Sequence, residues 1–391
     1  MKVGAAIYSM LKDDSAVAAL VGTRIYPELA EEGAVTPYVV YSVVSNTPVD
    51  TKESAPVDEA QLEVFSVADT YAAANDLADK VRTALSRQSK KVLDTVTVQS
   101  IKYTNEVTEV SAERNMYISV QDYTARLTPV PLLLDVYSGA HAVYSLRRLR
   151  SNYTGPAVRL RRSNDSETLD IGFDSDGNLD IAACNALFNG SNLTVKKWYD
   201  QSGNGNDVTQ STNSAQPLLY NTSGLISLNG RPVLQFLGND GLPFDESGLD
   251  VGSLSAFSVF KYDNTAGTQR AITLSGYEND RRFYIGHMDG GNFAYTYGNA
   301  SVGSATGNTN VNLHTMIAGA TIGHAEGFVN GVSVGNTSLV TGQAGNDTGI
   351  GRLGGSDPME GFVSELIVYG SDQSVNRTVI ENNINAYYSI Y

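Results

Sequence analysis

The chain has little of what disulfide-rich domains, cysteine-based metal sites and membrane proteins depend on. It contains one cysteine, Cys184, so no disulfide can form within the chain and no metal site can be built from several cysteines. No apolar run approaches the roughly 20 residues of a membrane-spanning helix, so we expect a soluble protein with no membrane partner. The net charge of −15 excludes the overall basic field that tight nucleic-acid binding needs.

What the chain does contain is a sharp change in composition at Thr128-Pro129-Val130-Pro131. At 391 residues it is longer than one hydrophobic core usually serves, which predicts two or more domains. The two prolines fix φ and remove two amide donors, so we expect a strand to end at Leu127. We therefore predict a first domain at residues 1–127, a short and stiff proline-containing linker at 128–131, and a second domain at 132–391.

The first domain has the pattern of an α+β fold with an antiparallel sheet and one long helix. Two short helices are expected near the start, and apolar residues at helical spacing predict the long helix from an N-cap at Asp69 to Arg87. Strands are predicted over residues 37–44, 60–68, 96–103 and 115–126. This half has no histidine or cysteine and its acidic residues are scattered, which argues against catalysis here.

Several stretches of the first domain together form a recognisable order: Ile7-Tyr8, residues 19–27 (ALVGTRIYP), residues 36–41 (TPYVVY), the helix positions Tyr71, Ala74, Leu77, Ala78, Val81 and Leu85, and residues 117–124 (YISVQDYT). This order resembles the tail completion or tail terminator proteins of long-tailed bacteriophages and covers nearly the whole domain. The resemblance implies a homo-oligomer, commonly a hexameric ring, that caps the tail tube protein and joins it to the head-tail connector or stopper protein. It further implies a virion protein of the tail or neck, made in the host cytoplasm, with DNA passing through the lumen without specific binding.

A polar loop is predicted between the first two strands, from Asn46 to Asp58. It is long for a hairpin connection, and long loops often carry function. Its charged residues are therefore candidates for contact with a neighbouring subunit or with the tail tube, although an ordinary mobile loop accounts for them equally well. They are Asp50, Lys52, Glu53 and Asp58.

The second domain has the composition of an all-β sandwich. Glycine, asparagine, serine and threonine become frequent after the linker, and helical periodicity is confined to residues 180–187 and 375–388. Short strands are predicted over residues 157–161, 193–199, 233–236, 257–261, 270–274, 283–287, 314–320, 326–329 and 361–369.

The most distinctive stretch of the second domain is residues 198–210 (WYDQSGNGNDVTQ), with residues 142–147 (AVYSLR) upstream and residues 228–232 (LNGRP) downstream. Together they resemble the catalytic sandwich of the fungal-type arabinofuranosidase B family. The closing Gly354-Gly355 and residues 361–369 (GFVSELIVY) are similar to the end of laminin-G-like and concanavalin A-like lectin sandwiches. These resemblances imply a jelly-roll fold across the whole domain.

The arabinofuranosidase activity is not expected to carry over with the fold. A retaining glycosidase needs two carboxyl groups about 5 Å apart, one as nucleophile and one as acid/base. Residues 286–289 (GHMD) resemble a stretch that precedes the family's nucleophile strand, but no acidic residue lies between Asp289 and Glu326. The family's acid turn is represented only by residues 354–357, with Asp357 displaced by one position. We read Asp289 and Asp357 as degenerate glycosidase positions and assign no catalytic residue.

One turn-rich loop concentrates oxygen ligands, through Asp200, Asn204, Asn206 and Asp207. These residues are candidates for a glycan-binding or calcium-binding loop, and calcium is the only cofactor we consider. Asx side chains that cap the turn itself are the more usual explanation. A basic stripe in the second domain has two interpretations as well: a docking surface or, as the more usual explanation, a solvated sheet face. Its residues are Arg147, Arg148, Arg150, Arg159, Arg161 and Arg162.

These observations favour a structural tail terminator subunit that carries a lectin-like sandwich, displayed outward, for binding a host polysaccharide or the host surface. The alternative is a glycoside hydrolase of arabinofuranosidase type on an assembly domain. A third hypothesis makes the sandwich a purely structural collar.

Overall fold

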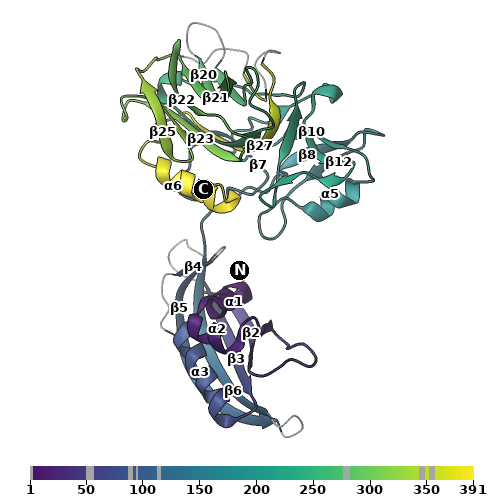
Figure 1. The fold of residues 1–391 in the computed structure, drawn as a ribbon, viewed down its shortest axis with the longest axis vertical. Coiled ribbons are helices and arrows are strands. Elements are labelled where there is room, and N and C mark those ends of the chain that lie inside the picture. The colour runs from purple at the N-terminus through teal and green to yellow at the C-terminus, as the bar shows by residue number, and fades with distance from the viewer. Residues whose placement is uncertain are drawn as a thin grey trace. The chain divides into compact units, whose positions relative to one another are not determined.

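The computed structural model describes residues 3–49, 57–86, 91–93, 96–111, 116–275, 282–342, 348–351 and 357–391. The chain divides into two compact units, Met1–Val130 and Pro131–Tyr391 (Figure 1). None of the described helices is long and apolar enough to cross a lipid bilayer. The two units are considered one at a time below.

The first unit opens with two short helices, α1 (Val3–Asp13) and α2 (Ser15–Val21). Asp14 is the N-cap of α2, because its Oδ1 accepts hydrogen bonds from the backbone N–H groups of Ala16 and Val17, both at 3.0 Å. Gly22, with φ of 56°, ends that helix. The long helix α3 (Tyr71–Leu85) follows the second long strand.

A single sheet forms the other layer of the first unit, with strand order β1-β2-β3-β6-β5-β4. The apolar residues that alternate along β3, Ala60, Leu62 and Val64, face the helices and join them in one core. The strands are β1 (Ile25–Pro27), β2 (Tyr38–Val49), β3 (Val57–Ala68), β4 (Lys91–Leu93), β5 (Val96–Ser111) and β6 (Met116–Pro129).

Several boundaries in the first unit differ from the predictions. The loop expected over Asn46–Asp58 is largely strand in its described part, because β2 continues to Val49 and β3 begins at Val57. The polar residues at 46 and 47 belong there because this end of β2 is exposed to solvent. Strand β6 runs through Leu127 to Pro129, so Thr128 and Pro129 belong to the sheet rather than to a linker. Proline is tolerated there because it is the terminal residue of the strand.

The second unit is a β-sandwich. One sheet has thirteen strands, in the order β25-β24-β23-β18-β27-β16-β12-β10-β8-β9, with β11, β13 and β7 attached to β10, β12 and β27. The facing sheet has six, in the order β17-β26-β19-β20-β21-β22. Apolar residues of both sheets, such as Phe260, Leu366, Ile285 and Tyr297, are buried in one shared core.

The strands of the thirteen-stranded sheet are β7 (Ala140–Ser145), β8 (Val158–Arg162), β9 (Thr168–Ile171), β10 (Leu193–Trp198), β11 (Val208–Thr209), β12 (Leu218–Asn221), β13 (Gly224–Leu225), β16 (Leu234–Leu237), β18 (Leu254–Tyr262), β23 (Asn312–Gly319), β24 (His324–Val329), β25 (Val332–Thr337) and β27 (Glu360–Tyr369). Those of the six-stranded sheet are β17 (Leu242–Pro243), β19 (Ile272–Ser275), β20 (Phe283–Asp289), β21 (Asn292–Tyr297), β22 (Ala300–Thr306) and β26 (Gly349–Ile350). A separate hairpin consists of β14 (Ser227–Leu228) and β15 (Arg231–Pro232).

Helices cover the outer face of the large sheet. The short α4 (Leu133–Val136) and the C-terminal α6 (Arg377–Tyr388) pack on it through Leu133, Ile380 and Ile384 against Phe257 and Ile367. A third helix, α5 (Ile181–Leu187), packs beside β9 and β12 and adds Cys184 and Leu187 to the same core. The strands β18 and β27 are therefore buried on both faces.

Candidate functional site

Asp200 lies in the turn between β10 and β11 and uses both carboxylate oxygens within the protein. Oδ1 accepts from the N–H groups of Val143 and Ser202, each at 2.8 Å. Oδ2 accepts from the Ser202 hydroxyl at 2.6 Å and from Asn206 N at 3.0 Å. The carboxylate thus fixes the turn and ties it to β7 in the neighbouring part of the sheet.

The other three predicted residues of this turn also bond to protein atoms. The Nδ2 groups of Asn204 and Asn206 donate to the carbonyl of His141 at 2.9 and 2.8 Å. Asp207 accepts from Asp200 N at 2.9 Å and from Lys197 Nζ at 3.1 Å. The structure therefore brings all four residues together in a pattern typical of Asx capping. No group of three or more His, Cys, Asp or Glu side chains that could hold a metal occurs in the described part of the chain.

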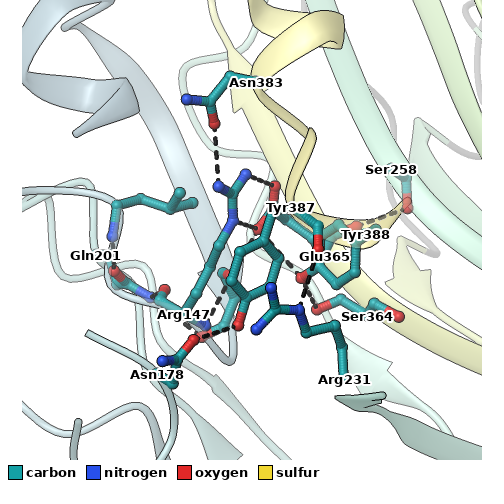
Figure 2. Close-up of polar contacts among 12 residues, drawn as sticks. Arg147, Asn178, Gln201, Arg231, Ser258, Ser364, Glu365, Asn383, Tyr387 and Tyr388 are labelled. Carbon is teal, nitrogen blue, oxygen red and sulfur yellow. Dashed lines mark hydrogen bonds and ion pairs between the residues drawn. The ribbon is translucent and has the colours of Figure 1, made fainter. Parts of the chain in front are cut away.

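A buried ion pair adjoins this turn (Figure 2). The sequence analysis did not predict it as a site. Arg147, directly after β7, donates from Nε to Glu365 Oε2 and from Nη2 to Glu365 Oε1, both at 2.9 Å. Glu365 lies in β27 and is 0% exposed, and Arg147 is 8% exposed. Ser145 Oγ also donates to Glu365 Oε2, at 2.6 Å. This is the bidentate geometry in which arginine binds a carboxylate most strongly.

Helix α6 closes over the ion pair. Asn383 accepts from Arg147 Nη1 at 3.0 Å, and the hydroxyl of Tyr388 donates to Glu365 Oε2 at 3.3 Å. The Arg147 guanidinium lies 4.6 Å from the centre of the Tyr387 ring, and that of Arg231 lies 4.0 Å from the centre of the same ring (Figure 2). We call Arg147, Glu365, Ser145, Asn383 and Tyr388 the Arg147–Glu365 cluster.

Burial and charge act in opposite directions on this cluster. Burial disfavours the charged form of Arg147, but the Glu365 carboxylate more than compensates, so the pKa of Arg147 is raised. Burial, and then the charge of Glu365, raise the pKa of Tyr388 well above its usual value. The tyrosine therefore stays a neutral hydrogen-bond donor, and the cluster has the character of a structural link between β7, β27 and α6.

Gln201 joins the cluster to the Asp200 turn. Its Nε2 donates to the carbonyls of Ser145 and Arg147 at 3.0 and 2.9 Å, and its Oε1 accepts from Leu149 N at 2.9 Å (Figure 2). The distinctive stretch at residues 198–210 thus serves to anchor the chain around β7. A glutamate in the middle of the apolar strand at residues 361–369 was the sequence signal for a buried charge.

The basic stripe is not a solvated sheet face throughout, which corrects that default interpretation. Arg147 and Arg161 are buried, the latter donating to Gln216 Oε1 at 2.8 Å. Arg159 pairs with Asp170 and Arg162 with Asp165, both at 2.6 Å. The interpretation was wrong because the spacing of arginines in the sequence does not show which of them the fold places beside acidic partners.

The two degenerate glycosidase positions lie in different local settings. Asp357 has φ of 49°, accepts from Arg270 N through its carbonyl at 3.0 Å, and forms an ion pair with the Arg270 guanidinium through its carboxylate. Asp289 is the last residue of β20 and pairs with Asn292 across the hairpin to β21.

Of the four charged residues predicted for the assembly loop, only Asp58 lies within the described residues. Asp50, Lys52 and Glu53 lie outside the described residues. Asp58 lies in β3 rather than in a loop, opposite Pro48 of β2, and accepts from Asn46 Nδ2 at 3.0 Å.

Comparison with known families separates the two units. Residues 5–128 match the model of the tail completion protein gp17 family. Residues 135–224 match the model of the α-L-arabinofuranosidase B catalytic domain, and this match ends before Asp289 and Asp357. Both resemblances predicted from the sequence are confirmed by these matches.

Solved structures with a similar fold include arabinofuranosidases, in line with the second family match. A GH54 α-L-arabinofuranosidase soaked with a cyclic sulfate inhibitor superimposes with a TM-score of 0.52 and 16% identity, covering 65% of this chain and 64% of that one. An arabinofuranosidase complexed with arabinofuranosyl-α-1,2-xylobiose superimposes with a TM-score of 0.51 and 16% identity, covering 65% of this chain and 64% of that one. A chain from the virion of a native gene transfer agent particle gives 0.27 and 21%, covering 31% of this chain and 91% of that one. The chain thus spans about 64% of the length of the arabinofuranosidases it resembles. No curated protein matches the sequence.

Proposed function

We propose that the chain is a structural virion subunit of a bacteriophage-type tail. In this proposal the first unit is a tail completion subunit that forms a ring, of hexameric type, on the tail tube and joins it to the head-tail connector or stopper. The observation that carries the proposal is the family match over residues 5–128, which spans nearly the whole first unit. The protein would be made in the host cytoplasm and end in the tail or neck of the virion.

The chemistry of the first unit is consistent with assembly rather than turnover. Two of its buried polar groups serve internal contacts: Gln121 donates to the carbonyl of Ala78 and to Glu106, and Tyr123 donates to Gln121. The negative net charge of the chain suits a lumen through which DNA passes without specific binding.

Reconstitution with tail-tube protein tests the assembly proposal. The full-length chain is mixed with growing tubes, and its mass is followed by light scattering while tube ends are viewed by electron microscopy. We expect closed rings at one end of each tube. A monomer both alone and with tubes would contradict the proposal. Antibody labelling of virions, directed to residues 132–391, locates the protein independently.

For the second unit we propose a lectin-like role, with several sandwiches displayed outward on one ring. Repetition around a ring would raise weak glycan affinity by multivalency. A glycan array and host cells are probed with the assembled ring and with dispersed subunits. Stronger binding by the ring supports this role. Binding to neither surface would favour the structural collar.

A glycoside hydrolase of arabinofuranosidase type is the second candidate, favoured by the match over residues 135–224 and by the shared fold. It is tested with a nitrophenyl arabinofuranoside. We expect no release of nitrophenol, because the Asp357 carboxylate is bound by Arg270. Release that is abolished by Asp289→Asn or Asp357→Asn would establish the hydrolase instead.

A further inference from the structure

Four asparagines of the second unit are each followed directly by a glycine: Asn189, Asn204, Asn229 and Asn330. In this dipeptide the backbone nitrogen of the glycine can attack the side-chain amide before it, because glycine has no Cβ to hinder the approach. The four pairs share the same local chemistry. Any difference in their reactivity in the folded chain therefore comes from the structure around each of them.

The fold holds three of these side-chain amides with two hydrogen bonds each. Nδ2 of Asn204 donates to the carbonyls of the first two residues of β7 at 3.0 and 2.9 Å. Nδ2 of Asn229 donates to two carbonyls at the C-terminal end of α6 at 3.0 and 3.2 Å. Asn330 accepts from Leu313 N at 2.9 Å and donates to Asn312 Oδ1 at 3.0 Å. None of these amides can turn toward the following glycine without breaking its bonds.

Exposure to solvent alone does not separate the four sites. Asn204 and Asn229 are exposed, as Asn189 is, although their amides are bound. Water and hydroxide therefore reach at least three of the four pairs. What distinguishes them is whether the side chain and the next backbone nitrogen are already engaged in hydrogen bonds.

Asn189 lies in the bend between α5 and β10, directly after Phe188, which is the C-cap of α5. No described residue forms a hydrogen bond with its side chain, and the N–H of Gly190 likewise has no partner among the described residues. Gly190 has φ of 88°, and no neighbouring heavy atom lies within 4 Å of the position that a Cβ would take. Both reacting groups are therefore uncommitted and solvated.

We propose that Asn189 is a site of spontaneous deamidation in the folded chain, and that the fold protects the other three Asn-Gly pairs. Hydroxide removes the proton from the Gly190 nitrogen, which attacks Cγ of Asn189. The new N–Cγ bond forms as the Cγ–Nδ2 bond breaks, and ammonia leaves with a proton from water, which regenerates hydroxide. Water then opens the resulting cyclic imide at either carbonyl, giving aspartate or isoaspartate.

The modification changes the surface of the second unit and leaves its neighbouring elements in place. Either product adds a negative charge, and isoaspartate also lengthens the backbone by one methylene. The end of α5 is tied to β8 independently of Asn189, because Arg162 Nη1 donates to the Leu187 carbonyl at 2.8 Å. The second unit thus carries a surface position that changes with age and needs no enzyme.

Peptide mapping by mass spectrometry follows all four sites in one molecule. The full-length chain is stored at mildly alkaline pH and sampled over time. We expect Asn189 to convert at least about tenfold faster than each other site, since tenfold corresponds to about 1.4 kcal/mol of local opening and each other amide must break two hydrogen bonds. Fragmentation that distinguishes isoaspartate from aspartate should find both products, which is the signature of the cyclic imide.

The same chain in denaturant is the matched control, because there the four pairs should convert at similar rates. Asn189→Gln should remove the rapid conversion from the folded chain and leave the rates at Asn204, Asn229 and Asn330 unchanged. The proposal is wrong if any of these three converts as fast as Asn189 in the folded chain. It is also wrong if Asn189 stays unmodified in the folded chain while the denatured chain converts.

Discussion

The two units treat their polar groups in opposite ways. The second unit places charged side chains inside and satisfies them there, as in the Arg147–Glu365 cluster, and its large sheet is covered on both faces. The first unit packs helices on one face of its sheet, and its short outer strands β1 and β4 pair with only three residues each of β2 and β5. Among the described residues, the buried charged side chains all lie in the second unit, whereas the first unit buries only uncharged polar side chains. The loss of one charged partner should therefore cost more stability in the second unit than in the first.

The largest expected effect comes from breaking the Arg147–Glu365 cluster. Glu365→Ala leaves the Arg147 guanidinium buried without its partner, and such a change costs about 3–5 kcal/mol of unfolding free energy. Hydrogen exchange read by mass spectrometry should show the loss in the second unit alone.

A matched control uses the exposed pair Arg126 and Glu59 of the first unit, where Arg126 Nε lies 2.9 Å from Glu59 Oε2. Glu59→Ala should cost about 0.5 kcal/mol or less. The double variant Arg147→Met with Glu365→Leu should recover much of the loss caused by Glu365→Ala. Equal effects of Glu59→Ala and Glu365→Ala would contradict the contrast between the units.

The next effect is a pH dependence confined to the second unit. His314 is buried, stacks on Phe260 with ring centres 3.9 Å apart, and approaches the Tyr295 hydroxyl with Nδ1 at 2.6 Å. Burial lowers the pKa of His314 from 6.5 to about 3. Between pH 6.5 and 3, His314 therefore binds a proton in the unfolded chain but not in the folded chain. The stability of the folded state consequently decreases as the pH falls from 6.5 toward 3.

At pH 5 the loss should be about 2 kcal/mol relative to pH 7.5, since each unit of pKa difference corresponds to about 1.4 kcal/mol. Denaturant titrations of the full chain at both pH values measure it. His314→Phe keeps the stack and leaves Tyr295 its bond to the Phe328 carbonyl at 3.0 Å, so the variant should lose this pH dependence. His324→Gln, at a partly exposed histidine, is the control. An unchanged pH slope in His314→Phe would refute the assignment.

A smaller effect is expected in the Asp200 turn. Asp200→Asn turns one oxygen acceptor into a donor that faces the N–H and O–H donors of Ser202, Asn206 or Val143, which should cost about 1–2 kcal/mol. Thermal unfolding of the full chain measures the loss. Millimolar calcium should leave the midpoint unchanged if the side chains only cap the turn. A calcium-dependent rise that disappears in Asp200→Asn would establish the calcium site instead.

The sequence predicts the existence of elements better than their ends or their partners. Apolar alternation located β8, β10, β18 and β27, because a strand with one or two buried faces must show it. The same alternation cannot reveal that β5 extends to Ser111, where the strand is solvated and polar. Glu365 and Arg147 lie 218 positions apart, and only the fold brings them together.

The smallest effect follows from one such boundary in the first unit. The N-cap of α3 is Thr70, whose Oγ1 accepts from Ala73 N at 3.2 Å, and not Asp69 as the sequence predicts, because Asp69 instead accepts from the Thr36 hydroxyl at 2.6 Å. Thr70→Ala should therefore cost about 1 kcal/mol and Asp69→Ala less than about 0.5 kcal/mol, measured as the exchange protection of α3. A larger loss of α3 protection in Asp69→Ala than in Thr70→Ala would show instead that Asp69 is the cap, as the sequence predicts.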